Sequence, residues 1–234
     1  MSSGSIHPYW LPLRESFSAA ADSHIAVGAS AYMKNKSVFF GIPSPNRRKL
    51  LGQFIAQYGL PEITEVYEIV MNAWKQPERE FQYAAMETLY KMKKLLNGSH
   101  ISLFSEMITT KSWWDTVDYI SPNLLGEVIA RFPVMKTPTI NDFMASNNIW
   151  LQRACLLFQL RYREKTDESL LFDLSRALSG EKEFFIRKAI GWALRQYAKT
   201  NPESVGRFVS VTPLSGLSRR EALKHIGDKT FQAD

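Results

Sequence analysis

The chain has 234 residues, and its 29 lysines and arginines against 23 aspartates and glutamates give a net charge of +6 and a pI near 9.3. A chain of this length buries a full hydrophobic core, and 45% hydrophobic with 22% charged residues is typical of globular rather than disordered proteins. Cys155 is the single cysteine, which excludes an intrachain disulfide framework, and no apolar run approaches the ~20 residues that a membrane-spanning helix needs. We therefore expect a cytoplasmic protein without membrane contact.

Helical periodicity runs through nearly the whole sequence, with apolar residues every three or four positions over 80–96 and 149–162. Strand-like alternation is hard to find. In chain order, the pattern predicts helices over 9–20, 25–34, 45–58, 62–74, 78–96, 100–109, 113–131, 138–145, 148–164, 167–178, 182–199, 202–210 and 217–226. No long linker divides the chain, so we expect one domain over 1–234, with residues 1–6 disordered or derived from a cloning vector and 227–234 as a tail.

Basic or aromatic residues begin successive helical patterns at a nearly constant spacing. The steps are 34, 33, 36, 35 and 33 residues, and the residues are Arg47, Phe81, Trp114, Trp150, Phe185 and Ser218. A repeat of this length is typical of a helix pair that buries its apolar face only by stacking on its neighbours. We therefore predict an all-α fold, a curved solenoid of about six helical repeats with a concave surface. The alternative that the sequence leaves open is a helical bundle without repeats.

A stripe of basic residues that includes a tryptophan follows one face of the helix predicted over 182–199. Its members are Lys188, Trp192, Arg195 and Lys199. A basic stripe is usually a solvated face, but a large aromatic residue within it is unusual unless it meets a partner. Trp192 therefore either belongs to a binding surface or packs against the neighbouring repeat.

Basic residues also gather at the starts of other repeats. Arg47 and Arg48 lie at the first start, and Arg153 shares a helix face with Trp150. Equivalent positions of a solenoid project from the same side, so these residues would form one positive strip. Such a strip neutralises successive phosphates by displacing counterions, which predicts a nucleic-acid groove. Scattered, solvated charge is the alternative.

The segment 111–118 combines two tryptophans with two carboxylates. Ser112 is expected to cap the helix that follows, and Asp115 lies in its first turn, where negative charge is favourable. Asp118 follows Trp114 by four residues, so the two side chains share a face. A partly desolvated aspartate beside an indole stabilises a developing cation through its own charge and the ring's negative face. The alternative is an ordinary helical aspartate paired with a lysine or arginine.

Motifs for several common kinds of chemistry are absent from the sequence. It contains no GxxxxGK[ST], GxGxxG, HExxH or GxSxG segment. The four histidines lie far apart without metal-ligand spacing, and a lone Cys155 cannot form a thiolate metal site. We therefore expect neither a metal nor a cofactor.

Several stretches of the chain together resemble the AlkD family of DNA alkylation-repair glycosylases, which are built from HEAT-like repeats. The matching stretches are AYMKN (31–35), PEREFQ (77–82), TKSWWDTVD (110–118), NIWLQRA (148–154), KEFFIRKAIGWALRQYAKTNP (182–202) and LSRREALKHI (217–226). The resemblance as a whole extends from about residue 7 to residue 226, and the combination of these stretches at these separations is specific where each alone is not. The resemblance implies a right-handed solenoid that grips duplex DNA in its basic concave face.

The resemblance also implies an activity and roles for individual residues. The family hydrolyses the N-glycosidic bond of N3- and N7-alkylated purines and leaves the lesion in the base stack. Asp118 matches its catalytic aspartate, and Trp114 and Trp192 match the two tryptophans that lie against the deoxyribose of the lesion. No lysine nucleophile is implied, so strand cleavage is not expected.

Further residues match positions that contact DNA in the family. Arg153 matches an arginine that holds the DNA backbone, and Trp150 is expected to brace it. Aromatic residues of the same cleft are matched by Tyr32, Phe184 and Phe185. The sequence departs from the family pattern at Pro43, where the family has a glutamine that faces DNA.

The leading hypothesis is thus a monomeric, monofunctional alkylpurine DNA glycosylase that acts on duplex DNA, with Lys188, Arg195, Arg47 and Arg48 as further DNA-binding residues. A DNA-binding relative without catalysis is the first alternative, and Pro43 leaves room for it. A helical scaffold that binds proteins is the second, and it would carry apolar patches in place of a basic strip.

Overall fold

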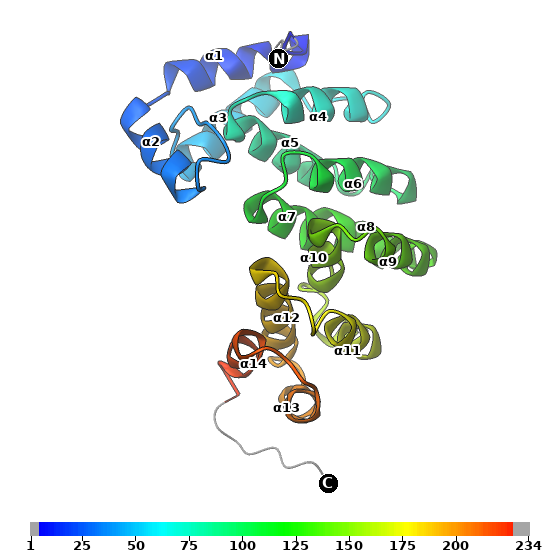
Figure 1. Ribbon diagram of the computed structural model, residues 1–234. Helices are drawn as coiled ribbons and strands as arrows, with labels where there is room; N and C mark the ends of the chain where they lie inside the picture. Colours follow the sequence, from blue (N-terminus) through cyan, green and yellow to red (C-terminus); the bar gives the residue numbers. More distant parts are fainter. Residues whose placement is uncertain (1–4, 227–234) are drawn as a thin grey trace. The chain divides into compact units, whose positions relative to one another are not determined.

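The computed structural model describes residues 5–226 (Figure 1). The chain divides into two compact units, Met1–Leu103 and Phe104–Asp234. The expected tail at 227–234 and the first four residues lie outside the described residues. Ser5 and Ile6, expected to be disordered, are within them: the Ser5 carbonyl accepts a hydrogen bond from Asn72, and Ile6 is buried.

The predicted all-α class is confirmed, because the elements of residues 5–226 are helices and the one β contact is an isolated bridge between Val38 and Glu78. The first unit contains η1 (Pro8–Trp10), α1 (Leu11–Ala19), α2 (Ser23–Tyr32), α3 (Ser44–Tyr58), α4 (Val66–Lys75), α5 (Arg79–Lys91) and η2 (Gly98–His100), and the boundary between the units falls within α6 (Ile101–Thr109). The second unit contains α7 (Trp114–Ile120), the π-helical turn η3 (Ser121–Leu125), α8 (Gly126–Arg131), η4 (Pro133–Met135), α9 (Lys136–Ala145), α10 (Ile149–Leu157), η5 (Arg163–Lys165), α11 (Glu168–Ala177), α12 (Phe184–Tyr197), α13 (Pro202–Val211) and α14 (Gly216–Leu223). None of the helices in this described part of the chain has the length and apolar character needed to cross a bilayer.

The helices pack as pairs, and this pairing follows the repeat in the sequence. In the first unit α1 packs on α3 and α4 on α5, while in the second α9 packs on α10, α11 on α12 and α13 on α14. Five of the six residues that mark the repeat lie in the second helix of one of these pairs, and the sixth, Trp114, begins α7. These second helices also pack on one another, α3 on α5 in the first unit and α7, α10, α12 and α14 in succession in the second. The handedness and concave face of the expected solenoid stay predictions.

Several helices differ from their predicted course. The predicted helix over 62–74 begins at Val66, and the one over 78–96 ends at Lys91. The predicted helix over 148–164 ends at Leu157, because Gln159 ties the following turn to Asp167, whose backbone N–H it accepts at 2.8 Å. The predicted helix over 113–131 is continuous but contains the π-helical turn at Pro122, which has no N–H for the α-helical hydrogen bond.

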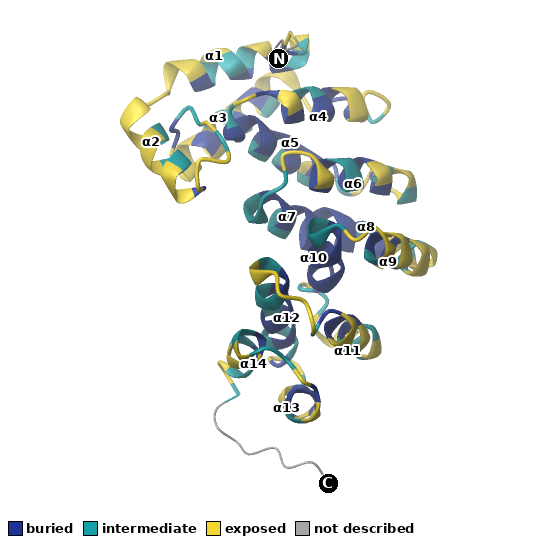
Figure 2. Cartoon of the chain, in the orientation of Figure 1, coloured by how far each residue is buried: buried dark blue, intermediate teal, exposed yellow. Residues whose placement is uncertain are grey.

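Buried residues make up most of α5 and α10, so these two helices are dark over most of their length in Figure 2. Glu80 of α5 is almost fully buried, and its carboxylate accepts the backbone N–H groups of Phe40, Gly41 and Ile42. Gly41 has a φ of 87°, and a Cβ there would lie 2.0 Å from the carbonyl oxygen of Asp22. Glycine is therefore required where this loop turns into α3.

Candidate active site

A cleft of about 280 Å³ lies in the second unit and is formed by α7, α10, α12 and α14. The three residues predicted to be catalytic line it together with most of the predicted DNA-binding residues. The lining residues are Trp114, Asp118, Arg153, Phe184, Phe185, Lys188, Trp192, Arg195 and Glu221. Residues from four helices thus converge here.

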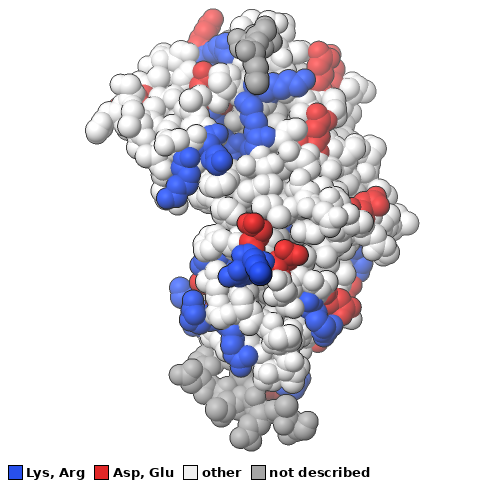
Figure 3. Space-filling view, in the orientation of Figure 1, with Lys and Arg blue, Asp and Glu red and all other residues white. Residues whose placement is uncertain are grey.

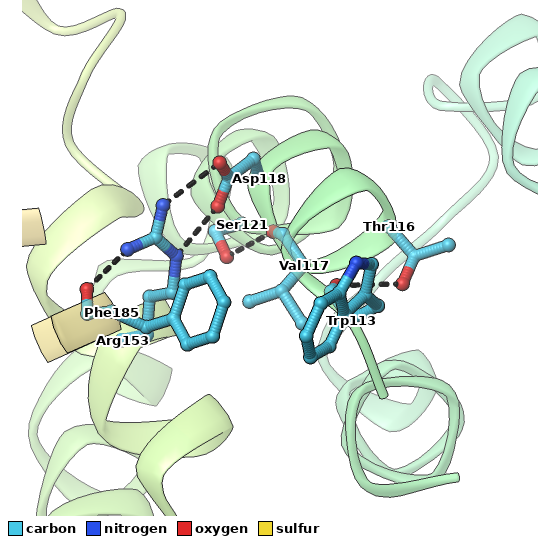
Figure 4. Close-up of polar contacts among 7 residues, drawn as sticks. All are labelled: Trp113, Thr116, Val117, Asp118, Ser121, Arg153 and Phe185. Carbon is cyan, nitrogen blue, oxygen red and sulfur yellow. Dashed lines mark hydrogen bonds and ion pairs between the residues drawn. The ribbon is translucent and has the colours of Figure 1, made fainter. Parts of the chain in front are cut away.

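Arg153 and Asp118 form a two-point ion pair between α10 and α7 (Figure 4). Arg153 Nε donates to Asp118 Oδ1 at 2.7 Å and Nη2 donates to Oδ2 at 2.8 Å. The remaining Nη1 donates to the backbone carbonyl of Phe185 at the start of α12. The Arg153 side chain is 5% exposed and that of Asp118 is 16% exposed, so solvent reaches mainly the carboxylate. The arginine therefore fixes the aspartate in the wall of the cleft.

Burial has the largest effect on the pKa of Asp118. Removal from water raises its pKa above the ordinary aspartate value, and the negative charge of Asp115 adds to this effect. The hydrogen bonds and charge of Arg153 oppose burial and lower the pKa in part. A carboxylate with a raised pKa is a stronger proton acceptor than an exposed carboxylate of ordinary pKa. The positive charge of Arg153 meanwhile favours the ionised form of Asp118.

An aromatic cluster lies beside Arg153. The Phe185 ring centroid is 6.0 Å from Arg153 Cζ and 4.9 Å from the Trp150 ring, and Trp113 packs edge-on against Phe185 at 5.1 Å. Trp150 is therefore one contact removed from Arg153 along this chain of rings. Phe184 at the mouth of the cleft is 54% exposed and packs edge-on against Phe185.

The helix starts position this site in different ways. Asn148 caps α10 by accepting the N–H groups of Trp150 and Leu151. The expectation that Ser112 caps α7 is wrong, because its hydroxyl donates to the carbonyl of Ile108 at 2.6 Å. Ser112 thus bonds to the end of the preceding helix, and Trp113 occupies the cap position of α7, where no side chain caps the helix.

Glu221 of α14 is the cleft residue that the sequence did not single out. Its two carboxylate oxygens accept Lys188 Nζ at 2.8 Å and Arg195 Nη1 at 2.6 Å. The hydrogen bond from Lys188 lowers the pKa of Glu221 below its usual value, and the charges of Lys188, Arg195 and Lys224 contribute. Glu221 lies 33 residues after Lys188, which is one repeat step, so the repeat itself carried a signal for this contact.

The other predicted DNA-binding residues lie in the first unit. Tyr32 ends α2 and is 71% exposed, and Arg48 on α3 is also exposed. Arg47 is 5% exposed, because both of its terminal nitrogens donate to Glu87 at 2.8 Å and its guanidinium covers the ring of Tyr83. Through these contacts, Arg47 packs α3 against α5.

Exposed charge is present in both units. Figure 3 shows lysine and arginine side chains over the region of α12 and α14, with acidic side chains near the start of α12. Pro43, which departs from the family pattern, is exposed directly before α3. Between residues 5 and 226, no group of three or more histidine, cysteine or acidic side chains is arranged to hold a metal ion.

Comparison with known proteins adds evidence from outside the chain. The sequence model of the DNA alkylation repair enzyme family matches residues 13–226. A solved structure described as a predicted DNA alkylation repair enzyme from Enterococcus faecalis is similar to this chain, with a TM-score of 0.83 and 32% identity over 89% of this chain and 97% of that one. No curated protein matches. The family match includes every residue that lines the cleft.

Proposed function

Because the chain belongs to the DNA alkylation repair enzyme family, we propose that it is a monofunctional DNA glycosylase that releases N3- and N7-alkylated purines from duplex DNA. The observation that carries this proposal is the Asp118–Arg153 ion pair in a cleft that Trp114 and Trp192 also line. A carboxylate that is held by an arginine in a cleft lined by aromatic rings suits a reaction in which positive charge develops on a sugar.

The substrate explains why the cleft needs no strong general acid. Alkylation at N3 or N7 gives the purine a positive charge, so the base leaves as a neutral molecule when the C1′–N bond breaks and takes the bonding electrons. The sugar then acquires oxocarbenium character, as in glycoside hydrolysis. The chemical demand is to stabilise this cation and to deliver water to C1′.

Asp118 would meet both demands. Its negative charge stabilises the developing cation, and its carboxylate accepts a proton from the water that attacks C1′. Arg153 occupies one edge of the carboxylate with two hydrogen bonds and thereby fixes the direction of the remaining lone pairs. Burial of Asp118 strengthens these electrostatic effects because less solvent screens them.

The tryptophans and cations would hold the DNA. Trp114 and Trp192 would present their ring faces to the electron-poor C–H groups of the deoxyribose, with the damaged base left in the stack. Lys188 and Arg195, and in the first unit Arg48 and Tyr32, would contact the backbone of the duplex. Arg47 is left out of this set because Glu87 already holds its guanidinium.

The proposed chemistry excludes strand cleavage. A lyase step needs a neutral amine as the nucleophile. The lysine that lines the cleft, Lys188, has its Nζ held in an ion pair with Glu221, so this nitrogen is not free to attack the sugar. Methylated duplex incubated with the protein should therefore acquire abasic sites that break only after alkali. Breaks without alkali would contradict the monofunctional assignment, and the absence of abasic sites would favour the binding-only alternative.

A further inference from the structure

We propose that Glu221 is a positioning residue that holds Lys188 and Arg195 together as one binding site for a DNA backbone phosphate beside Trp192. This inference rests on the proposed function, because it assigns the cation pair to the same cleft. It adds a residue that neither the sequence pattern nor the family description identifies.

The geometry of the two cations supports this role. Lys188 and Arg195 are seven residues apart on α12, which separates their backbones by about 10 Å along the helix. Their charged ends nevertheless meet on the two oxygens of one carboxylate, at 2.8 and 2.6 Å. A phosphate group presents two anionic oxygens in a similar way, so a pair of cations that fits a carboxylate also fits a phosphate.

The cations keep the capacity to bind a phosphate while Glu221 holds them. The Lys188 side chain is 38% exposed and the Arg195 side chain 22% exposed. An ammonium group has three N–H donors and a guanidinium has five, so donors remain beyond the contacts with Glu221. The triad of Lys188, Arg195 and Glu221 retains a net charge of +1, which still attracts DNA.

The packing of α14 on α12 is specialised to bring Glu221 this close. A Cβ at Gly191 of α12 would lie 2.4 Å from Glu221 Cβ and 2.9 Å from the carbonyl oxygen of Ser218. The Ser218 hydroxyl donates to the carbonyl of Arg187 at 2.9 Å and fixes the start of α14 against α12. Because Gly191 has no side chain, α14 packs close enough to α12 for Glu221 to contact both Lys188 and Arg195.

Without Glu221, the two cations would separate. They carry like charges on long, flexible side chains, and no other carboxylate lines the cleft near them except Asp118, which Arg153 occupies. A phosphate would then meet cations without a fixed position, and the sugar beside Trp192 would be placed less accurately. Catalysis should suffer more than affinity, because affinity depends mainly on the sum of charges.

Two variants distinguish the effect of Glu221 on the position of the two cations from the effect of its own charge. Glu221→Gln keeps the shape but presents an amide N–H group to one cation, and Glu221→Asp keeps the charge but is too short to reach both. We expect each to slow single-turnover release of 7-methylguanine about tenfold. The dissociation constant for undamaged duplex at low salt should be unchanged for Glu221→Asp. For Glu221→Gln it should not increase, so binding should be no weaker than that of the wild-type protein. Glu203→Gln, which removes an exposed carboxylate on α13, is the matched control.

A substrate variant tests the phosphate contact directly. Each phosphate that flanks the lesion is replaced in turn by an uncharged methylphosphonate. We expect one replacement to slow the wild-type protein and to have a smaller effect on Glu221→Gln, so that the two changes are not additive. Additive effects, wild-type rates for both Glu221 variants, or equal losses of rate and affinity with a lower unfolding temperature would each overturn the inference.

The outcome is distinguishable from a failure of the proposed function. If the wild-type protein releases no base from methylated duplex, the glycosylase proposal fails. The methylphosphonate series is then read out as the dissociation constant, and non-additivity with Glu221→Gln still supports the phosphate site.

Discussion

Arg153 donates two parallel hydrogen bonds to Asp118 across a separation of 35 residues in the sequence, and its third donor reaches the backbone of Phe185. Three helices are joined through this one guanidinium, since Asp118 lies on α7, Arg153 on α10 and Phe185 on α12. The carboxylate proposed for catalysis is thus held by the same stacking of repeats that forms the core. The position of Asp118, and with it the reactivity of its carboxylate, therefore depends on how these helices stack.

Asp118→Asn should remove most of the activity and leave DNA binding intact. The amide has nearly the same shape, but it supplies no negative charge to the developing cation and accepts no proton from water. Removal of such an electrostatic contribution costs about 100-fold or more in rate. Single-turnover release of 7-methylguanine measures this loss, and Asp142→Asn, an exposed aspartate on α9, is the control. A wild-type rate in Asp118→Asn would exclude Asp118 from the mechanism.

Arg153→Lys should impair both stability and turnover. A lysine keeps the charge but cannot offer two parallel hydrogen bonds to Asp118 and a third to Phe185. We expect the free energy of unfolding to fall by about 1–3 kcal/mol and base release to slow in a variant that is still folded. Thermal unfolding and single-turnover kinetics measure the two effects. Arg207→Lys, at an exposed position of α13, should change neither property. An unchanged Arg153→Lys protein would show that Asp118 does not need the arginine's geometry.

The pH dependence of the rate should reveal the raised pKa of Asp118. The active form is ionised, so base release should fall as the pH drops, with its midpoint above that of an ordinary aspartate. The effect on stability has the opposite sign: the folded state takes up this proton before the unfolded state does, so this group's contribution to stability grows as the pH falls through the same range. Comparison with Asp118→Asn isolates the group. A rate that is flat down to the ordinary aspartate pKa would contradict the assignment.

Gly191→Ala should destabilise the second unit. The added methyl group would meet Glu221 Cβ at 2.4 Å and the Ser218 backbone at 2.9 Å, so α14 must shift away from α12. Such overpacking costs about 1–3 kcal/mol, which thermal unfolding detects as a lower midpoint. Gly52→Ala on α3 is the control, because nothing lies within 4 Å of a Cβ there and alanine favours the helix. If both substitutions stabilise the protein, α14 does not pack on Gly191 as described.

Local patterns in the sequence predicted much of the fold. Helical periodicity located the helices, because it depends on neighbours within a few residues, and the regular spacing of basic and aromatic residues located the second helix of each pair. The same kind of signal placed Asp118 and Trp114 on one face and Lys188, Trp192 and Arg195 on another, and all five line the cleft.

The partners of charged residues could not be predicted in this way. Arg47 and Arg48 are adjacent in the sequence, yet Arg47 is buried against Glu87, 40 residues away, while Arg48 is exposed. Likewise, the resemblance suggested a contact of Arg153 with the DNA backbone, whereas the structure shows one hydrogen bond from each of its three nitrogens, two to Asp118 and one to Phe185. Ion pairs between repeats depend on how the helices stack, which a residue's near neighbours do not determine.

The central claim, hydrolysis of alkylpurine nucleotides at Asp118, is tested most directly by identifying the bases that the protein releases from methylated duplex DNA. We predict that the wild-type protein releases 3-methyladenine and 7-methylguanine, and that Asp118→Asn binds the same DNA but releases almost none. Absence of both bases after incubation with a folded, DNA-binding wild-type protein would contradict the claim.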